Sequence, residues 1–263
     1  MAPSGSETDL KGRSIVVERP RHADGVRPPS TRGLKAFQAE FDFSLEAICT
    51  RMLERHRKTI RTQKPHVAVT KLMRIVETTL TLANRKGFHS MSLRDLAQGS
   101  GLSMGALYTY FDSKETLLLM ILGEVSSAVA MTLGTTPPSI ADDPVARLRW
   151  LLETHVYLTE TMQPWFAFSY MEAKAFPKAA RDKATAAELE TETLIASALA
   201  DGTASGLFII GDIALTASLI KPLLQDWYVK RGKYRRRGVT PEHYVQAVTA
   251  FVGAAIGYRP RLG

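Results

Sequence analysis

Apolar side chains recur at steps of three or four along almost the whole chain, which is the period of one face of an α-helix. Leu34, Phe37, Phe41 and Leu45 begin one such face, and similar faces follow as far as residue 257. No segment shows convincing alternation of apolar and polar residues, which would indicate a β-strand. The sequence therefore predicts an all-α protein made of packed helices.

The chain has 263 residues, enough for one large domain or for a small domain joined to a larger one. Its net charge of +8 favours an anionic partner such as nucleic acid, an acidic membrane face or a phosphorylated ligand, although a basic solvated surface has the same charge. Cys49 is the single cysteine, which excludes an internal disulfide and fits a reducing compartment. Without a signal peptide or an apolar run of about 18 residues, we expect a cytoplasmic protein with no membrane partner.

The N-terminal part of the chain divides into two segments. Residues 1–33 are rich in Pro, Gly, Ser and mixed charge, and this composition predicts a disordered tail. Residues 34–65 predict one extra amphipathic helix that ends near Pro65. Its second half carries the basic residues Arg51, Arg55, Arg57, Lys58 and Arg61. The basic end has two open interpretations, an arm that reaches DNA or part of a helix that covers apolar surface, while the phenylalanine repeat favours the covering helix for residues 34–53.

Three serines stand where helices are expected to begin. Ser92, Ser103 and Ser113 each precede a helical run and are good N-cap residues. The glycine-containing turn GSGLS joins the first two runs, so the segment predicts a helix-turn-helix, although a generic helical hairpin shares this pattern. We expect the second helix to cover residues 103–111 and to fit a DNA major groove.

Several polar or small residues of this second helix are expected on its exposed side. Gly105 would let the backbone approach a surface, and hydroxyl groups would donate to phosphate oxygens. Lys114 would add a charge at the next helix N-terminus, where anions already bind well. The residues expected near the exposed side are Met104, Gly105, Tyr108, Thr109 and Tyr110.

Residues from about 68 to 122 resemble, without a gap, the DNA-binding domain of TetR-family regulators. The matching marks are Gly87-Phe88, Ser92-Leu93-Arg94-Asp95-Leu96-Ala97, Gly101-Leu102-Ser103, Gly105-Ala106-Leu107-Tyr108, Tyr110-Phe111 and Ser113-Lys114-Glu115. The resemblance implies a homodimeric transcription regulator, most often a repressor, that binds a near-palindromic double-stranded operator. It also implies a DNA-binding domain over residues 66–122 and a helical ligand-binding and dimerisation domain over residues 123–263.

The resemblance also implies roles for individual residues. Two serines would cap helices and touch phosphates, namely Ser92 and Ser103. The side chains nearest the bases would be Met104, Gly105, Ala106 and Thr109. The DNA backbone would be held by Tyr108, Tyr110 and Lys114. Many relatives have Lys or Arg where this chain has Met104, so readout would depend more on apolar contact with thymine methyl groups and on Arg94.

The C-terminal half contains no recognisable catalytic or metal-binding arrangement. No nucleophile, base and orienting group stand at a readable spacing, and His155 and His243 are isolated in the sequence. We therefore expect no enzyme activity, no cofactor and no metal ion.

An aromatic cluster is the candidate ligand site, although most such clusters are simply core. TetR-family regulators hold their ligand cavity among these central helices, and cavities are mostly apolar with few polar groups. The candidate ligand-binding residues are Trp165, Phe166, Phe168, Tyr170, Met171 and Lys174. Glu172 is a second candidate polar group, and a surface pair of Glu172 with Lys174 is the alternative.

Residues 169–182 and 227–237 are also similar to TetR-family regulators of lipid metabolism that sense acyl-CoA. This similarity implies an acyl-CoA or fatty-acid ligand. The phosphates of CoA could meet the basic residues Lys230, Arg231, Lys233, Arg235, Arg236 and Arg237. A solvated basic loop is an equally open interpretation of that segment. The function we expect is a repressor that a small apolar ligand releases from its operator. The alternative is an effector-independent regulator that acts through a protein partner.

The last two helices are the expected dimer interface. Family analogy implies a four-helix bundle with the partner subunit, and small side chains there would allow close helix approach. The expected interface residues are Tyr244, Ala247, Val248, Phe251 and Ala254. An internal helix pair would use the same residues.

Overall fold

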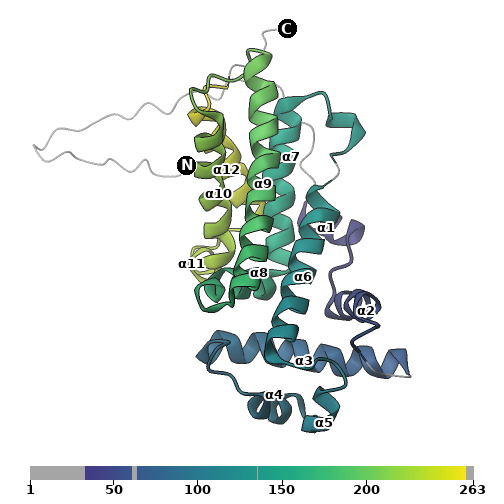
Figure 1. The fold of residues 1–263 in the computed structure, drawn as a ribbon. Helices are drawn as coiled ribbons and strands as arrows, with labels where there is room; N and C mark the ends of the chain where they lie inside the picture. The colour runs from purple at the N-terminus through teal and green to yellow at the C-terminus, as the bar shows by residue number, and fades with distance from the viewer. Residues whose placement is uncertain (1–32, 61–63, 135, 259–263) are drawn as a thin grey trace, which may run out of the picture. The chain divides into compact units, whose positions relative to one another are not determined.

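The computed structural model describes residues 33–60, 64–134 and 136–258, and this part of the chain is helical without any β-strand (Figure 1). The all-α prediction is confirmed. Apart from Gly33, the predicted N-terminal tail lies outside the described residues. The α-helices are α1 Leu34–Glu40, α2 Leu45–Arg55, α3 Pro65–Lys86, α4 Leu93–Ser100, α5 Met104–Leu107, α6 Lys114–Leu133, α7 Pro144–Thr161, α8 Gln163–Met171, α9 Lys178–Ala204, α10 Ile213–Val229, α11 Arg231–Arg236 and α12 Pro241–Ala255.

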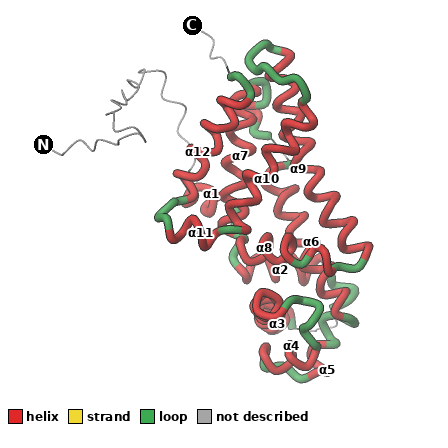
Figure 2. The backbone as a smooth tube through the Cα atoms, turned by 90° about the vertical axis from the view of Figure 1, so that its left-hand side faces the viewer, coloured by secondary structure: helices red, strands yellow, loops and turns green. Residues whose placement is uncertain are grey.

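Helices α3, α4, α5 and the start of α6 form the helix-turn-helix unit (Figure 2). The three predicted N-caps are confirmed, because each serine Oγ accepts a hydrogen bond from the backbone N–H three residues ahead. These bonds are 3.1 Å long at Ser92, 3.2 Å at Ser103 and 3.1 Å at Ser113. Gly87 and Gly101 follow α3 and α4 with φ values of +80° and +62°, which glycine adopts at low cost. Local chemistry therefore fixes where these helices begin and end.

Helix α7 is the centre of the C-terminal half. Its residues from Leu151 to Thr159 are buried, and it packs against α6, α9, α10 and α12. Helix α6 is long and apolar enough to cross a membrane by length and composition alone. Its apolar side chains are instead packed against α7, α8 and α9, which is the behaviour of a core helix. Because α6 begins beside α5 and continues to Leu133, the expected boundary at residue 122 lies inside one continuous helix.

The prediction of a single helix over residues 34–65 is wrong. The chain leaves the helix at Phe41, where Asp42 Oδ1 accepts a hydrogen bond from the backbone N–H of Ser44 at 2.9 Å. Ser44 then caps α2. Pro65 does not end a helix but stands in the first turn of α3, where its missing N–H costs nothing.

The two N-terminal helices cover apolar surface of the same chain, as expected for residues 34–53. Phe37, Ile48 and Met52 are buried, and α1 packs on α7 while α2 packs on α3 and α6. The basic residues at the end of this segment differ in their surroundings. Arg55 is bound to α6, Arg57 and Lys58 are exposed, and Arg61 lies outside the described residues. A DNA-reaching arm therefore stays a prediction.

One ion pair ties α2 to α6. Arg55 donates to the carboxylate of Glu124 and, through its other terminal nitrogen, to Ser127 Oγ at 2.8 Å. Glu124 is buried, and this burial raises the pKa of its carboxyl group, while the Arg55 guanidinium opposes the rise. A buried carboxylate that loses its cation keeps the desolvation cost without the compensating attraction.

We predict that Arg55→Ala lowers the free energy of unfolding by about 1–3 kcal/mol, because Glu124 would be left buried without its partner. Urea titration followed by circular dichroism measures this change. The exposed Arg57→Ala is the charge-matched control and is expected to stay near wild type. Equal stability of the two variants would contradict the assigned role of the pair.

Candidate functional site

The helix-turn-helix unit presents a polar surface at α4 and α5. Tyr108, which follows α5 directly, is 51% exposed, and a Cβ atom added at Gly105 would meet nothing within 4 Å. Backbone at Gly105 is therefore open to close approach by another molecule. The predicted contact residues that are exposed are Ser92, Arg94, Ser103, Gly105 and Tyr108. Those that are half-buried are Met104, Ala106, Thr109 and Lys114.

The expectation that Tyr110 lies on the exposed side is wrong. Helix α5 ends at Leu107 instead of continuing to residue 111, and the Tyr110 N–H donates to the Leu107 carbonyl at 2.9 Å in the turn that follows. This turn directs Tyr110 into the core, where it is 2% exposed. Its side chain is therefore not placed to reach a phosphate. Met104 is also partly packed against the core.

Lys114 is engaged inside the unit. Its Nζ donates to the carbonyl oxygens of Phe88, His89 and Met91 at 3.0, 2.7 and 2.9 Å. An ammonium group has three protons, so these three bonds use all of them. Lys114 therefore holds the loop between α3 and α4, and the expectation that it holds the DNA backbone does not agree with this geometry.

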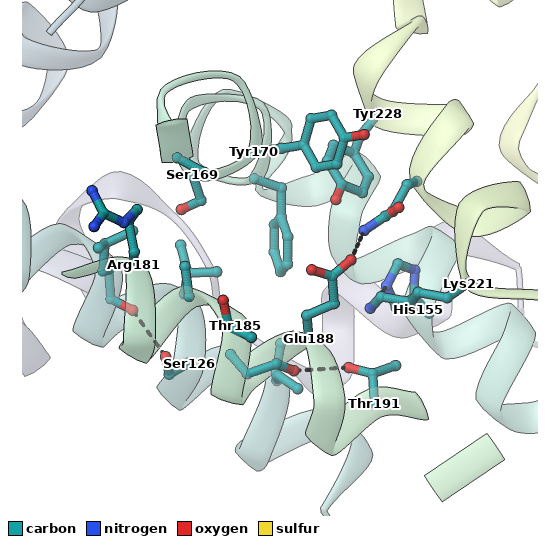
Figure 3. A pocket seen from close by; sticks show the side chains of 18 of the residues that line it. Ser126, His155, Ser169, Tyr170, Arg181, Thr185, Glu188, Thr191, Lys221 and Tyr228 are labelled. Atoms are coloured by element: carbon teal, nitrogen blue, oxygen red, sulfur yellow. Dashed lines mark hydrogen bonds between the residues drawn. The ribbon is translucent and has the colours of Figure 1, made fainter. Parts of the chain in front are cut away.

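A cavity of about 300 Å³ lies among α6, α7, α8, α9 and α10 (Figure 3). Much of its wall is apolar, from residues such as Val125, Val129 and Phe166. Tyr170, on α8, is 47% exposed and lines it together with the buried Tyr228 of α10. This volume stands at the lower end of the range for small-molecule sites.

Two buried side chains, His155 and Lys221, meet at the wall of this cavity. Lys221 Nζ lies 3.3 Å from His155 Nε2, and the two residues are 6% and 2% exposed. Burial lowers the pKa of Lys221 to about 8, and burial followed by the charge of Lys221 lowers that of His155 well below its ordinary value. At pH 7 Lys221 is therefore mostly charged and donates to a neutral imidazole.

More polar groups line the cavity. Gln225 Nε2 donates to Glu188 Oε1, and Arg181 donates to the Phe176 carbonyl at 2.7 Å. Arg181 and Lys221 lie on opposite sides of the cavity in Figure 3. The charged residues that line it are Lys174, Arg181, Glu188 and Lys221. Cations therefore outnumber anions at this wall.

The structure separates the predicted ligand-binding residues into two groups. Phe166, Tyr170 and Lys174 line the cavity. Trp165, Phe168 and Met171 instead line a different hollow, between α3 and α8. Sequence reasoning missed the residues that α7, α9 and α10 contribute, which are His155, Arg181, Glu188, Lys221, Gln225 and Tyr228. The one local feature of the sequence that points to these residues is Lys221, a charged residue in the mostly apolar run SLIKPLL.

Half of the basic residues in the segment after residue 229 are paired with acids. Lys230 and Lys233 lie 2.6 and 2.8 Å from the carboxylate of Asp226, and Arg231 lies 2.6 Å from that of Glu160. The remaining basic residues are exposed, namely Arg235, Arg236 and Arg237. None of these residues lines the cavity. The observed pairs favour the solvated interpretation of this segment.

The expected dimer residues fall on two faces of α12. Tyr244 and Val248 are buried within the chain, and Tyr244 donates to the Leu223 carbonyl at 2.6 Å. Ala247, Phe251 and Ala254 are exposed, with Phe251 at 62%. On α10 the apolar side chains Leu215 and Leu219 are also exposed, at 55% and 63%. We call the exposed residues Leu215, Leu219, Ala247, Phe251 and Ala254 the α10–α12 face.

Helix α8 links the cavity to the helix-turn-helix unit. Phe168, on α8, packs edge-to-face on Phe88 with 5.6 Å between ring centroids. Glu172, which follows α8, accepts a hydrogen bond from the Phe88 N–H at 2.9 Å. Phe166 and Tyr170 of the same helix line the cavity. One short helix therefore touches both regions.

Comparison with known proteins gives matches over both halves of the chain. The family model of bacterial regulatory proteins of the tetR family matches residues 75–121, and the model of the tetracyclin repressor-like C-terminal domain matches residues 141–252. The transcriptional repressor KstR of Mycobacterium tuberculosis is 28% identical over 140 residues, which cover 51% of this chain and 58% of the relative. The chain thus spans little more than half the length of this curated relative.

Two solved structures are similar in fold. The TetR-family regulator PfmR of Thermus thermophilus has a TM-score of 0.54 and 27% identity, covering 72% of this chain and 100% of that one. AibR, solved in complex with isovaleryl coenzyme A and operator DNA, has a TM-score of 0.59 and 19% identity, covering 70% of this chain and 97% of that one. With both family models matched in order along the sequence, the chain belongs to the TetR family of bacterial regulatory proteins.

Proposed function

We propose that this protein is a DNA-binding transcription repressor that a small apolar ligand releases from its operator. The observation that carries the proposal is the link through α8 between a polar helix-turn-helix surface and an internal cavity. KstR, a relative, is named a transcriptional repressor, and AibR was solved with both a coenzyme A ester and operator DNA. In this role the protein is not an enzyme and acts in the cytoplasm, where bacterial DNA lies.

The alternative is a regulator that responds to no effector and acts through a protein partner. A tightly packed C-terminal half would favour it. The cavity lined by both apolar and charged side chains favours a small-molecule effector instead.

Gel shift of the purified protein on the DNA upstream of its own gene tests the proposal, with and without octanoyl-CoA, octanoate and longer homologues. Binding that one ligand class weakens is the expected result. Tight binding that no ligand disturbs would contradict the effector and leave the alternative. No binding at all would contradict a role at that promoter.

In the proposed complex, the α4–α5 surface enters the major groove. Gly105 allows close approach, Ser103 and the exposed hydroxyl of Tyr108 reach phosphates, and Arg94 is an exposed cation near the base edges. Met104 has no hydrogen-bond donor on its side chain, so it reads bases by apolar contact. Two such surfaces in a dimer would meet successive major grooves about 34–36 Å apart.

We predict that Tyr108→Ala weakens binding to all DNA sequences by about tenfold, because a phosphate contact is lost. Met104 variants are expected to change sequence preference instead. Affinity selection from a randomised operator library separates the two effects. Tyr110→Phe is the control and should leave affinity unchanged, since Tyr110 is buried. Equal loss across the whole library for Met104 variants would contradict the assignment.

The α10–α12 face is the proposed homodimer interface. Its exposed apolar side chains would be covered by the same face of a second copy, with the alanines letting the helices approach closely. Tyr244 and Val248 would support this interface from behind, since they pack inside the chain.

We predict that Leu219→Glu converts the dimer to a monomer, because a carboxylate would be placed in an apolar interface. Analytical ultracentrifugation measures the change. Leu189→Glu is the matched control, because Leu189 on α9 is similarly exposed, at 61%, but lies outside the α10–α12 face. A dimer that survives Leu219→Glu and dissociates with Leu189→Glu would move the interface to α9.

Ligand binding would reach the DNA surface through α8. A molecule in the cavity displaces Phe166 or Tyr170, and α8 carries that movement to Phe168 and Glu172 at the loop after α3. The ligand must bind more tightly to the conformation with the lower DNA affinity. Acyl-CoA fits this scheme when its acyl chain enters the cavity and its phosphates stay near Lys174 and Arg181.

We predict that Glu172→Ala reduces the effect of the releasing ligand on operator affinity by about 2- to 30-fold, the range of typical coupling mutants. Fluorescence anisotropy with labelled operator measures the affinity with and without ligand. Glu190→Ala, an exposed residue of α9, is the control. Full release of DNA by ligand in Glu172→Ala would exclude this route.

A further inference from the structure

The polar pair in the cavity restricts the chemistry of its ligand. A purely hydrocarbon chain that filled the cavity would leave Lys221 charged and desolvated against apolar atoms, which is unfavourable. The Lys221 ammonium makes one hydrogen bond, to His155, and forms no ion pair with a carboxylate of the described residues. Two of its three protons therefore have no acceptor in this part of the chain.

His155 adds a second donor without an acceptor. Because a protonated ammonium can only donate, Nε2 of His155 accepts and the ring proton is on Nδ1. Nδ1 is buried and has no hydrogen-bond partner among the described residues. Buried polar groups in folded proteins are nearly always satisfied, so the protons that the Lys221 ammonium leaves unpaired at the cavity wall indicate that a bound molecule supplies an acceptor.

Neighbouring carboxylates do not accept the unpaired protons of Lys221. Glu188 and Glu192, both on α9, raise the pKa of Lys221 through their charge, yet neither forms an ion pair with it. Glu188 already accepts a hydrogen bond from Gln225. Within the lining, Lys174, Arg181 and Lys221 outnumber the single carboxylate of Glu188. An anion is thus the complementary guest.

We propose that the effector carries a carboxylate at its buried end, which accepts hydrogen bonds from Lys221 Nζ, while its apolar body lies against Phe166, Val125 and Val129. The inference rests on the proposed function only in treating this cavity as the effector site. A cavity of about 300 Å³ is at the lower end of the range for small-molecule sites, so medium-chain acids of about eight carbons are suitable probes.

Two kinds of molecule supply this chemistry. A free carboxylic acid would enter carboxylate first. A coenzyme A thioester of a dicarboxylic acid would place its free carboxylate at Lys221 and its phosphates near Lys174 and Arg181. A thioester with a plain alkyl end lacks the acceptor.

Isothermal titration calorimetry of the full chain at pH 7 tests the proposal with two matched probe pairs. The pairs are octanoate with 1-octanol, and octanedioyl-CoA with octanoyl-CoA. In at least one pair the carboxylate is expected to bind about 10- to 100-fold more tightly, the worth of a charge-assisted hydrogen bond. The pair that shows the preference identifies the source. Equal affinities in both pairs, or no binding by any probe, would overturn the proposal.

Lys221→Met is expected to remove that preference, because methionine keeps the volume and loses the charge. Lys178→Met is the control, since it removes the same charge from an exposed position of α9 and should keep the preference. A preference that survives Lys221→Met would overturn the proposal. The melting temperature of each variant is measured in parallel to establish that it folds.

A pH series on the unaltered protein gives the same answer without any substitution. The groups that face Lys221 are His155 of α7 and Glu188 and Glu192 of α9, with Tyr228 on its own helix. The probe acid is ionised from pH 7 to 9.5, and the pKa of Tyr228 is raised by burial. The pKa of Lys221 in the empty cavity is about 8.

The carboxylate preference should accordingly be constant below pH 8 and decrease above it, approaching about tenfold per pH unit. A preference that does not change up to pH 9.5 would contradict the assignment to Lys221. Operator binding is measured separately. Release of DNA by octanoyl-CoA without a carboxylate preference would keep the proposed function and overturn this inference. A carboxylate preference that depends on Lys221, with DNA affinity unchanged by the ligand, would keep this inference and contradict the proposed function.

Discussion

The contact of α8 with the loop that follows α3 joins the cavity to the helix-turn-helix unit. Glu172 accepts the Phe88 N–H, Phe168 packs on the Phe88 ring, and Lys114 fixes the same loop from the other side through three carbonyl oxygens. The loop is therefore bonded to both α8 and the start of α6. A movement of α8 cannot leave the helix-turn-helix unit unaffected unless these bonds break.

Helix α6 reinforces this connection. It starts at the helix-turn-helix unit with the Ser113 cap and continues along the cavity, which Leu122, Val125 and Val129 line, so both regions share one continuous backbone. The pair of Arg55 with buried Glu124 adds α2 to the same helix. Sites coupled by shared rigid elements need only a small difference in ligand affinity between two conformations to change DNA binding.

Local features of this chain could be predicted from the sequence, and non-local ones could not. Ser92, Ser103 and Ser113 cap helices through contacts only three residues away, so short patterns identify them. The helical period predicts an exposed Tyr110, but α5 stops after one turn and that period no longer applies. Proline is compatible with both the end of one helix and the start of the next, so Pro65 alone does not distinguish the two.

The residues of the cavity are the ones that the sequence pattern identifies least completely. The aromatic cluster in the sequence identifies Phe166 and Tyr170, which line the cavity. Their neighbours Trp165 and Phe168 line a different hollow, because successive residues of a helix face different directions. Lys221 meets His155 across 66 positions of sequence. Only the packing of α7 against α10 brings that pair together.

The distance between the two helix-turn-helix units of a dimer, measured by pulsed electron spin resonance, reports directly whether ligand binding moves these units. A spin label at Gln98→Cys, exposed on α4, reports it, because Cys49 is buried and its thiol pKa is raised to about 12. Saturation with a ligand that releases DNA is predicted to shift the distance distribution, and Glu172→Ala to reduce that shift. Release of DNA with an unchanged distance distribution would contradict coupling through α8.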